Sequence, residues 1–324
     1  MINVLVSGVG SVMGYGMLRS LKQSRPDIRL IGTDISPVAV GQVWCDHFEV
    51  APPTATHNYL DWLLGVVAAE NIDLILPGFD QDVQRLLECE DKLKTVGCTV
   101  ALNEPLLVRL SADKWEMYRY LVARGLSCAI PSALSGTFES LTEVFGRPFL
   151  LKPRSGYGSK GILTINSQDE FDGHKNRLGE VYLAQRIVGT ADQEFSVGVF
   201  GDGRGDVSAS ITLKRTLGPD GATSRAGSVF EPTLDAVVSE LVDLFRPIGP
   251  TNLQFRRGEE GWKLLEINPR VSSSASIRAL LGYNEAQMAV EYYLEGRLPA
   301  QPLISRGFVA RYLEDVVLDA RHNF

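Results

Sequence analysis

The segment at residues 263–276, K-L-L-E-I-N-P-R-V-S-S-S-A-S, carries a carboxylate, an amide and a guanidinium at alternate positions. Successive side chains of a strand point to opposite faces, so Glu266, Asn268 and Arg270 share one face. Carboxylate and amide oxygens suit a divalent cation, and a guanidinium suits phosphate oxygens. The pattern therefore indicates nucleotide chemistry.

The same segment has a purely structural interpretation, in which its leucines and isoleucine fill a core while the polar residues face water. The stretch before it favours a site. G-P-T-N-L-Q-F places Asn252 and Gln254 with the same alternation, and the G-E-E-G that follows predicts a hairpin turn. Two antiparallel strands would then present Gln254, Glu266 and Asn268 in one patch, which is a candidate site for Mg²⁺ or Mn²⁺.

A second segment, R-P-F-L-L-K-P-R-S-G-Y-G-S-K-G-I-L, predicts two strands joined by a glycine-rich flap. Lys152 lies on the first, buried strand, and Ser155, Gly156 and Gly158 follow it. The flap is not a P-loop, because no G-K-[ST] opens a helix, and a mobile hairpin tip is the structural alternative. Bare glycine backbone can close over phosphates and lysine is a compact phosphate ligand, so we expect the flap to cover a nucleotide.

The first hundred residues alternate strand and helix signals, which predicts a parallel sheet covered by helices. Glycines at positions 8, 10, 14 and 16 lie where the first strand meets the first helix, and backbone amides there can face an anion. With Asp34 they match a dinucleotide fingerprint loosely, and a tight turn is the alternative. Asp80 and Asp82 follow another strand and are expected at the same carboxyl edge, where a small substrate would bind.

Further along the chain, Lys114 opens a helix, V-Y-L-A-Q-R-I-V-G gives a strand and a turn, and a long strand starts at Glu194. In this order, with the flap, N-L-Q-F and L-E-I-N-P-R-V-S, the motifs resemble those of the ATP-grasp superfamily. The nearest resemblance is to one synthetase unit of the carbamoyl phosphate synthetase large subunit, over roughly residues 111–300. The E-I-N-P-R-V-S stretch is its most specific element.

This resemblance implies a fold of class α/β and α+β in three parts. They are a Rossmann-like (pre-ATP-grasp) parallel-sheet domain at residues 1–110, a small lid subdomain at 111–188, and a large ATP-grasp subdomain with a C-terminal extension at 189–324. The resemblance implies phosphate binding by Lys114, Lys152 and the flap (Ser155, Gly156, Gly158), an adenine hinge at Gln185, Arg186, Ile187 and Val188, and ribose binding by Glu194. It also implies metal binding by Gln254, Glu266 and Asn268, and a catalytic role for Arg270 with Lys152 in stabilising the transferring phosphoryl group. Arg225, in a loop with a solvated alternative, is implied only by position as a carboxylate or acyl-phosphate ligand.

The sequence departs from that pattern in two places. Gln254 stands where relatives often carry a carboxylate, so the metal site rests chiefly on Glu266. Ser273 stands where carbamoyl phosphate synthetases carry an arginine, and neither a second synthetase half nor a glutaminase is visible. We therefore do not expect this chain to make carbamoyl phosphate by itself.

The implied function is that of an ATP-dependent, ADP-forming carboxylate–amine (or carboxylate–thiol) ligase, acting on a small polar acid through an acyl phosphate. Such chemistry needs alignment and charge neutralisation more than a protein nucleophile. Three alternatives stay open: a small-molecule kinase, a subunit like that of carbamoyl phosphate synthetase, and a nucleotide-binding protein without turnover.

Charge and composition exclude some classes of binding partner. The formal charge of −7 argues against nucleic acid, since polyanion binders carry basic surfaces. No stretch approaches the ~18 apolar residues of a membrane span, and the opening residues do not form an export leader. Four scattered cysteines fit a reducing cytoplasm. The oligomeric state is open, with a homodimer as the default expectation.

Overall fold

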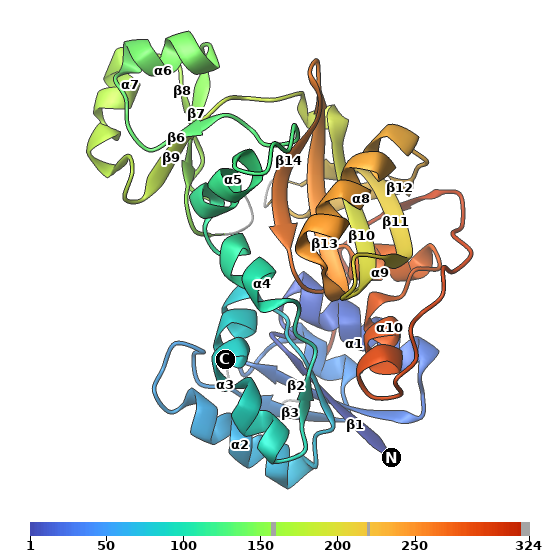
Figure 1. The fold of residues 1–324 in the computed structure, drawn as a ribbon. Helices are drawn as coiled ribbons and strands as arrows, with labels where there is room; N and C mark the ends of the chain where they lie inside the picture. The colour runs from blue at the N-terminus through green and yellow to red at the C-terminus, as the bar shows by residue number, and fades with distance from the viewer. Residues whose placement is uncertain (157–159, 219–220, 319–324) are drawn as a thin grey trace.

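The computed structural model describes residues 1–156, 160–218 and 221–318. Three β-sheets organise this part of the chain, and helices pack on each of them (Figure 1). The predicted class, a parallel α/β sheet followed by antiparallel α+β sheets, is confirmed.

The first sheet is parallel and has the strand order β3-β2-β1-β4-β5. Its strands are β1 (Ile2–Ser7), β2 (Ile28–Asp34), β3 (His47–Val50), β4 (Leu74–Leu76) and β5 (Thr99–Val100). Its connections contain α1 (Val12–Ser24), η1 (Val40–Trp44), α2 (Tyr59–Glu70) and α3 (Asp80–Thr95). The strand order reverses between β1 and β4, which is where open sheets of this type bind ligands.

Alternation along β1 explains why both faces of this sheet are covered. Val4 and Val6 pack with the apolar side of α1, whereas Leu5 packs on the other face with residues of α2 and α3. A late helix, α10 (Glu285–Tyr293), joins α1 on its face through Ala286, Ala289 and Val290. The C-terminal part of the chain therefore helps to cover the N-terminal sheet.

The second sheet is small and antiparallel, in the order β6-β9-β7-β8. It consists of β6 (Ser132–Ala133), β7 (Phe149–Pro153), β8 (Leu163–Ile165) and β9 (Tyr182–Gln185), with α6 (Phe138–Phe145), α7 (Gln168–Asp172) and η2 (Lys175–Arg177). Phe145, Phe149 and Phe171 centre its own core. The predicted pairing of two strands around the flap is confirmed, because β7 pairs with β8.

The third sheet has six strands in the order β14-β13-β10-β11-β12-β15. They are β10 (Glu194–Asp202), β11 (Val207–Leu217), β12 (Thr223–Ser228), β13 (Ile248–Gly258), β14 (Gly261–Asn268) and β15 (Phe308–Ala310). The remaining helices are α4 (Pro105–Ser111), α5 (Lys114–Val122), η3 (Ala191–Gln193), α8 (Pro232–Phe245) and α9 (Ala275–Leu280). The predicted hairpin is confirmed: β13 pairs antiparallel with β14, and Gln254 lies opposite Glu266.

The limits at 110/111 and 188/189 stay a prediction, although the strands of each sheet fall within one predicted range. Packing does not follow those limits strictly. Met117 and Leu121 of α5 lie in the core of the six-stranded sheet, not in that of the small sheet. No helix of the described residues is long and apolar enough to cross a membrane.

Candidate functional site

A cavity of about 240 Å³ lies between the small sheet and the six-stranded sheet. It collects residues from many parts of the chain. The predicted site residues in its lining are Lys114, Lys152, Gly156, Gln185, Arg186, Ile187, Val188, Glu194, Gln254, Glu266, Asn268 and Arg270. Ser155 is exposed outside this lining, and Gly158 lies outside the described residues.

Lys152 is placed by β7, between the small sheet and the end of the β13–β14 hairpin. Its side chain is buried, and Nζ donates to the backbone oxygen of Leu265 at 3.3 Å. Burial lowers the pKa of Lys152 to about 8, and the nearby Glu266 carboxylate opposes this shift only in part. A bound phosphate would stabilise the charged form of this buried ammonium strongly, because its oxygens replace the water molecules that the ammonium lost on burial.

This lowered pKa predicts a pH dependence of nucleotide binding. Below pH 8 Lys152 is charged, whereas above pH 8 binding must take up a proton, at a cost of about 1.4 kcal/mol per pH unit. We expect calorimetry to show ADP affinity falling by up to about tenfold per unit above pH 8. Lys152→Arg should remove this dependence, since arginine stays charged. An equally steep fall in that variant would contradict the assignment.

Protein stability should change with pH in the opposite direction. Because the folded state favours neutral Lys152, the unfolded chain binds more protons between pH 8 and the ordinary lysine value of 10.5. The contribution of this residue to the free energy of unfolding therefore rises over that range. The titration of Lys152 makes the fold more stable between pH 8 and 10.5, so unfolding caused by this residue cannot explain a loss of ADP affinity over that range.

Lys114 ties α5 to the flap. Asp113 caps α5 by accepting from the amides of Trp115 and Glu116, and this sets Lys114 at the first helical position. Lys114 Nζ donates to the backbone oxygen of Gly156 at 2.9 Å. Arg154, also in the flap, pairs with Asp113 at 2.6 Å. The described part of the flap is therefore anchored by two cations, and one of them, Lys114, faces the cavity.

Glu194 is the predicted ribose ligand, and its carboxylate is buried between two arginines. Arg215 Nη2 lies 2.6 Å from Oε1, while Arg256 donates to Oε2 through Nε at 3.1 Å and Nη2 at 3.0 Å. An ionised carboxylate offers about four lone-pair positions, and these three donors leave about one for a ribose hydroxyl. Glu194 therefore has a structural role in the cavity wall whether or not it also binds ribose.

The structure places Arg215, not Arg225, at the cavity. Arg215 is buried on β11 and also donates to Gln254 Oε1 at 2.6 Å, whereas Arg225 is exposed on β12 and is absent from the lining. The expectation that Arg225 faces the site is therefore corrected. Both arginines flank the same glycine-rich turn in the sequence, and strand alternation alone could not tell which one points inward.

The three residues predicted as metal ligands on the hairpin differ in how many hydrogen bonds their oxygens already accept. Glu266 accepts no hydrogen bond from any described residue, so its carboxylate suits a cation. Among the residues that the structure describes, Asn268 Oδ1 accepts one long bond, 3.3 Å, from Arg270. Gln254 Oε1 is already held by the Arg215 guanidinium, whose charge repels a cation. The donor set fits one Mg²⁺ on Glu266 and Asn268 better than it fits two ions.

Arg270 is buried at the end of the E-I-N-P-R segment and is held by the carboxylate of Asp80, the first residue of α3. Its Nε and Nη2 atoms lie 2.7 Å from Oδ1 and Oδ2 of Asp80. The predicted edge with Asp80 and Asp82 thus meets the six-stranded sheet at this point. Asp82 turns elsewhere and accepts from Ser7 and Thr54.

The glycine segment after β1 forms a tight turn, which was the structural alternative to a dinucleotide site. Gly8 has φ +63°, and a Cβ built on it would lie 2.1 Å from the ring of Phe79. Asp34 accepts from the amides of Gly10 at 2.8 Å and Ser36 at 2.9 Å, so its carboxylate holds the loop together. The ring of Phe79 therefore packs directly against the turn at Gly8.

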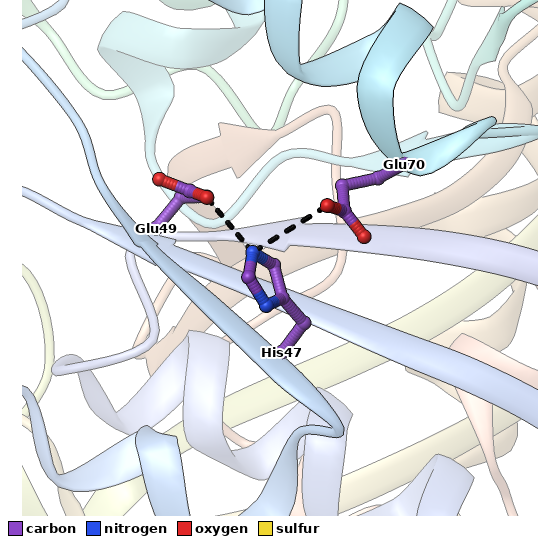
Figure 2. Close-up of side chains that lie close together, drawn as sticks. All are labelled: His47, Glu49 and Glu70. Carbon is purple, nitrogen blue, oxygen red and sulfur yellow. Dashed lines mark hydrogen bonds and ion pairs between the residues drawn. The ribbon is translucent and has the colours of Figure 1, made fainter.

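A second cluster of side chains of the kinds that bind metals, one histidine and two glutamates, lies outside the cavity, at the edge strand β3 of the first sheet. His47 Nε2 faces Glu49 at 2.8 Å and Glu70 at 3.6 Å, as Figure 2 shows. All three side chains are partly exposed, and Glu70 also pairs with Arg29. These ion pairs account for the cluster, so we assign it no function. Strand alternation places His47 and Glu49 on the same face of β3, but no local sequence pattern predicts that Glu70 lies beside them.

Two family models match parts of this chain. Residues 4–101 match the family described as "PylC-like, N-terminal domain", and residues 189–316 match "ATP-grasp in the biosynthetic pathway with Ter operon". The carbamoyl phosphate synthase large chain of Methanosphaerula palustris is 21% identical over 299 residues. That match covers 86% of this chain but only 28% of the relative.

Solved structures share the fold at low sequence identity. A carboxyaminoimidazole ribonucleotide synthase from Aspergillus clavatus, complexed with ATP, matches with a TM-score of 0.73 at 18% identity, covering 95% of this chain and 80% of the other. The biotin carboxylase domain of a 2-oxoglutarate carboxylase from Hydrogenobacter thermophilus, complexed with MgADP and bicarbonate, matches with a TM-score of 0.70 at 16% identity, covering 94% and 73%.

Proposed function

We propose that this chain, which matches a PylC-like N-terminal domain over residues 4–101 and an ATP-grasp domain over residues 189–316, is an ATP-dependent, ADP-forming ligase. Its substrates would be a small polar carboxylic acid and an amine or thiol. One observation carries the proposal: Glu266 and Asn268 share a single cavity with Lys152 and Arg270. Oxygen ligands beside two buried cations are what phosphoryl transfer requires.

In the proposed reaction a substrate carboxylate oxygen attacks the γ-phosphorus of ATP, and the bond to the bridging oxygen of ADP breaks. The amine or thiol then attacks the acyl carbon, loses a proton and displaces phosphate. Lys152 and Lys114 would hold the phosphates, and Arg270 would stabilise the charge that builds on the transferring group. Mg²⁺ on Glu266 and Asn268 would neutralise phosphate charge when bound.

The relatives support a nucleotide site without naming the substrate. One solved structure of this fold holds ATP, and another holds MgADP with bicarbonate, which is itself a small carboxylate-like anion. Carbamoyl phosphate synthesis is not carried over, because this chain spans little more than a quarter of that relative. We propose that the small sheet acts as the lid and that residues 185–188 form the adenine hinge.

The proposal is tested by ADP release from purified protein with ATP, Mg²⁺ and a panel of carboxylates, each with and without amines. Hydroxylamine should trap an acyl phosphate as a hydroxamate. ADP release with a phosphorylated product and no hydroxamate would instead identify a small-molecule kinase. MgADP binding without ADP release across the panel would favour a nucleotide-binding protein without turnover.

A further inference from the structure

We infer that Asp80 is a positioning residue for Arg270, so that the PylC-like domain supplies part of the phosphoryl-transfer site. This inference rests on the proposed function. The two residues are 190 positions apart, Asp80 at the start of α3 and Arg270 just after β14, yet their side chains form a two-point ion pair at 2.7 Å for both contacts. Arg270 is only 7% exposed, and a planar fork paired to one carboxylate has little freedom to rotate.

The other contacts of Arg270 identify the hydrogen that a substrate can reach. Nη2 also donates to Asn268 Oδ1 at 3.3 Å, and Nη1 donates to the backbone oxygen of Val271 at 3.0 Å. The last contact of Nη1 is with the thioether sulfur of Met13 at 2.8 Å. A thioether is a weak acceptor, and Met13 lines the cavity. A phosphoryl oxygen can accept a hydrogen bond from Nη1 in place of the Met13 sulfur, while Asp80 stays bonded to Nε and Nη2 on the opposite edge of the guanidinium.

Asp80 is held in place by the turn that follows β4. The amide of Gly78 donates to Ser7 Oγ at 2.9 Å, and a Cβ at position 78 would lie 2.0 Å from the backbone oxygen of Ser7. Asp80 then begins α3, where the helix dipole favours an ionised carboxylate. Asp82, two residues further along, is already bonded to Ser7 and Thr54, which leaves Asp80 to meet Arg270.

Without Asp80, a competing attraction would act on Arg270. The Glu266 carboxylate also interacts favourably with this guanidinium. A released guanidinium is therefore expected to turn toward Glu266, the carboxylate proposed to hold Mg²⁺. Asp80 thus keeps the arginine and the metal ligand apart, and it does so without touching ATP itself.

The test uses the full chain and calorimetry with two ligands, MgADP alone and MgADP with aluminium fluoride, a mimic of the transferring phosphoryl group. Asp80→Asn keeps the size but can offer only one acceptor to the fork. We expect its MgADP affinity to stay within about twofold, while its affinity for the mimic falls about tenfold or more. Asp80→Glu should recover part of that loss. Glu88→Gln, an exposed position on the same helix, should behave like wild type.

Three results would overturn the inference: an unchanged affinity of Asp80→Asn for the mimic, an equal loss for both ligands, or the same loss in Glu88→Gln. An equal loss would mean that Asp80 merely supports the fold. If the wild-type protein fails to bind MgADP at all, the proposed function itself falls and the inference falls with it. A failure confined to the Asp80 variants leaves the proposed function intact.

Discussion

Replacing Glu266 by alanine is expected to lower ADP formation roughly a hundredfold or more, because the chain loses the carboxylate that we propose as the principal metal ligand of the cavity. Glu266 is half-buried and accepts no hydrogen bond from the described residues, so its removal leaves no donor without a partner. The melting temperature should therefore change little. The Mg²⁺-dependent gain in ADP affinity, measured by calorimetry with and without the metal, should disappear in this variant.

Glu259→Ala is the matched control, because Glu259 is an exposed glutamate in the turn of the same hairpin. It should keep both ADP formation and the response to Mg²⁺. If Glu266→Ala retained the wild-type response to Mg²⁺, the metal would have to bind elsewhere. The assignment of the hairpin as the metal site would then be abandoned.

Arg278→Met is expected to cost about 3–5 kcal/mol in the free energy of unfolding, because it leaves a buried carboxylate without its cation. Arg278 and Glu285 are both inaccessible to solvent, and Nη1 lies 2.5 Å from Glu285 Oε1. Nη2 also donates to Ser196 Oγ at 2.8 Å and Asn252 Oδ1 at 2.7 Å. Arg278 thus joins α9 and α10 to β10 and β13, and urea denaturation would measure its loss.

The pH dependence of that variant has a definite sign. Burial raises the pKa of Glu285 even beside Arg278, so the isolated carboxyl group should fold in its neutral form. Destabilisation should therefore be smaller at pH 5 than at pH 7. The double variant Arg278→Met with Glu285→Leu should recover much of the loss, since neither charge remains buried.

Arg297→Met provides the control for this second prediction. Arg297 forms exposed ion pairs with Glu291 and Glu295, and its replacement should leave stability unchanged. A double variant of Arg278 and Glu285 that is no more stable than Arg278→Met would contradict the ionic explanation. Lost packing around the long side chain would then be the cause.

Features that depend on short-range periodicity were predicted correctly from the sequence. Alternation along residues 252–268 was enough to pair two strands and to bring Gln254 and Glu266 opposite each other. The alternating strand and helix signals of the first hundred residues gave the parallel sheet in the same way. Both inferences needed only neighbours along one strand or one turn.

Contacts between distant segments could not be predicted in this way. Asp80 was assigned to a substrate edge and Arg270 to phosphate, but no local pattern shows that the two side chains meet. Nor does any pattern show that Glu194 is held by Arg215 and Arg256, because each arginine lies on a different strand beside β10. Such pairs depend on strand order and on sheet packing, which one sequence does not reveal.

The contact between Gly8 and Phe79 carries an evolutionary consequence. No side chain fits at position 8 while the ring stands opposite, and the left-handed backbone there disfavours one in any case. A side chain at position 8 should therefore arise only after the ring at position 79 has been replaced by a smaller residue. In a descendant where a small residue replaced the ring, space would open beside the turn, but the amides of Val9, Gly10 and Ser11 would stay bonded to Thr33, Asp34 and Gly8, so the turn would gain room without gaining an anion site.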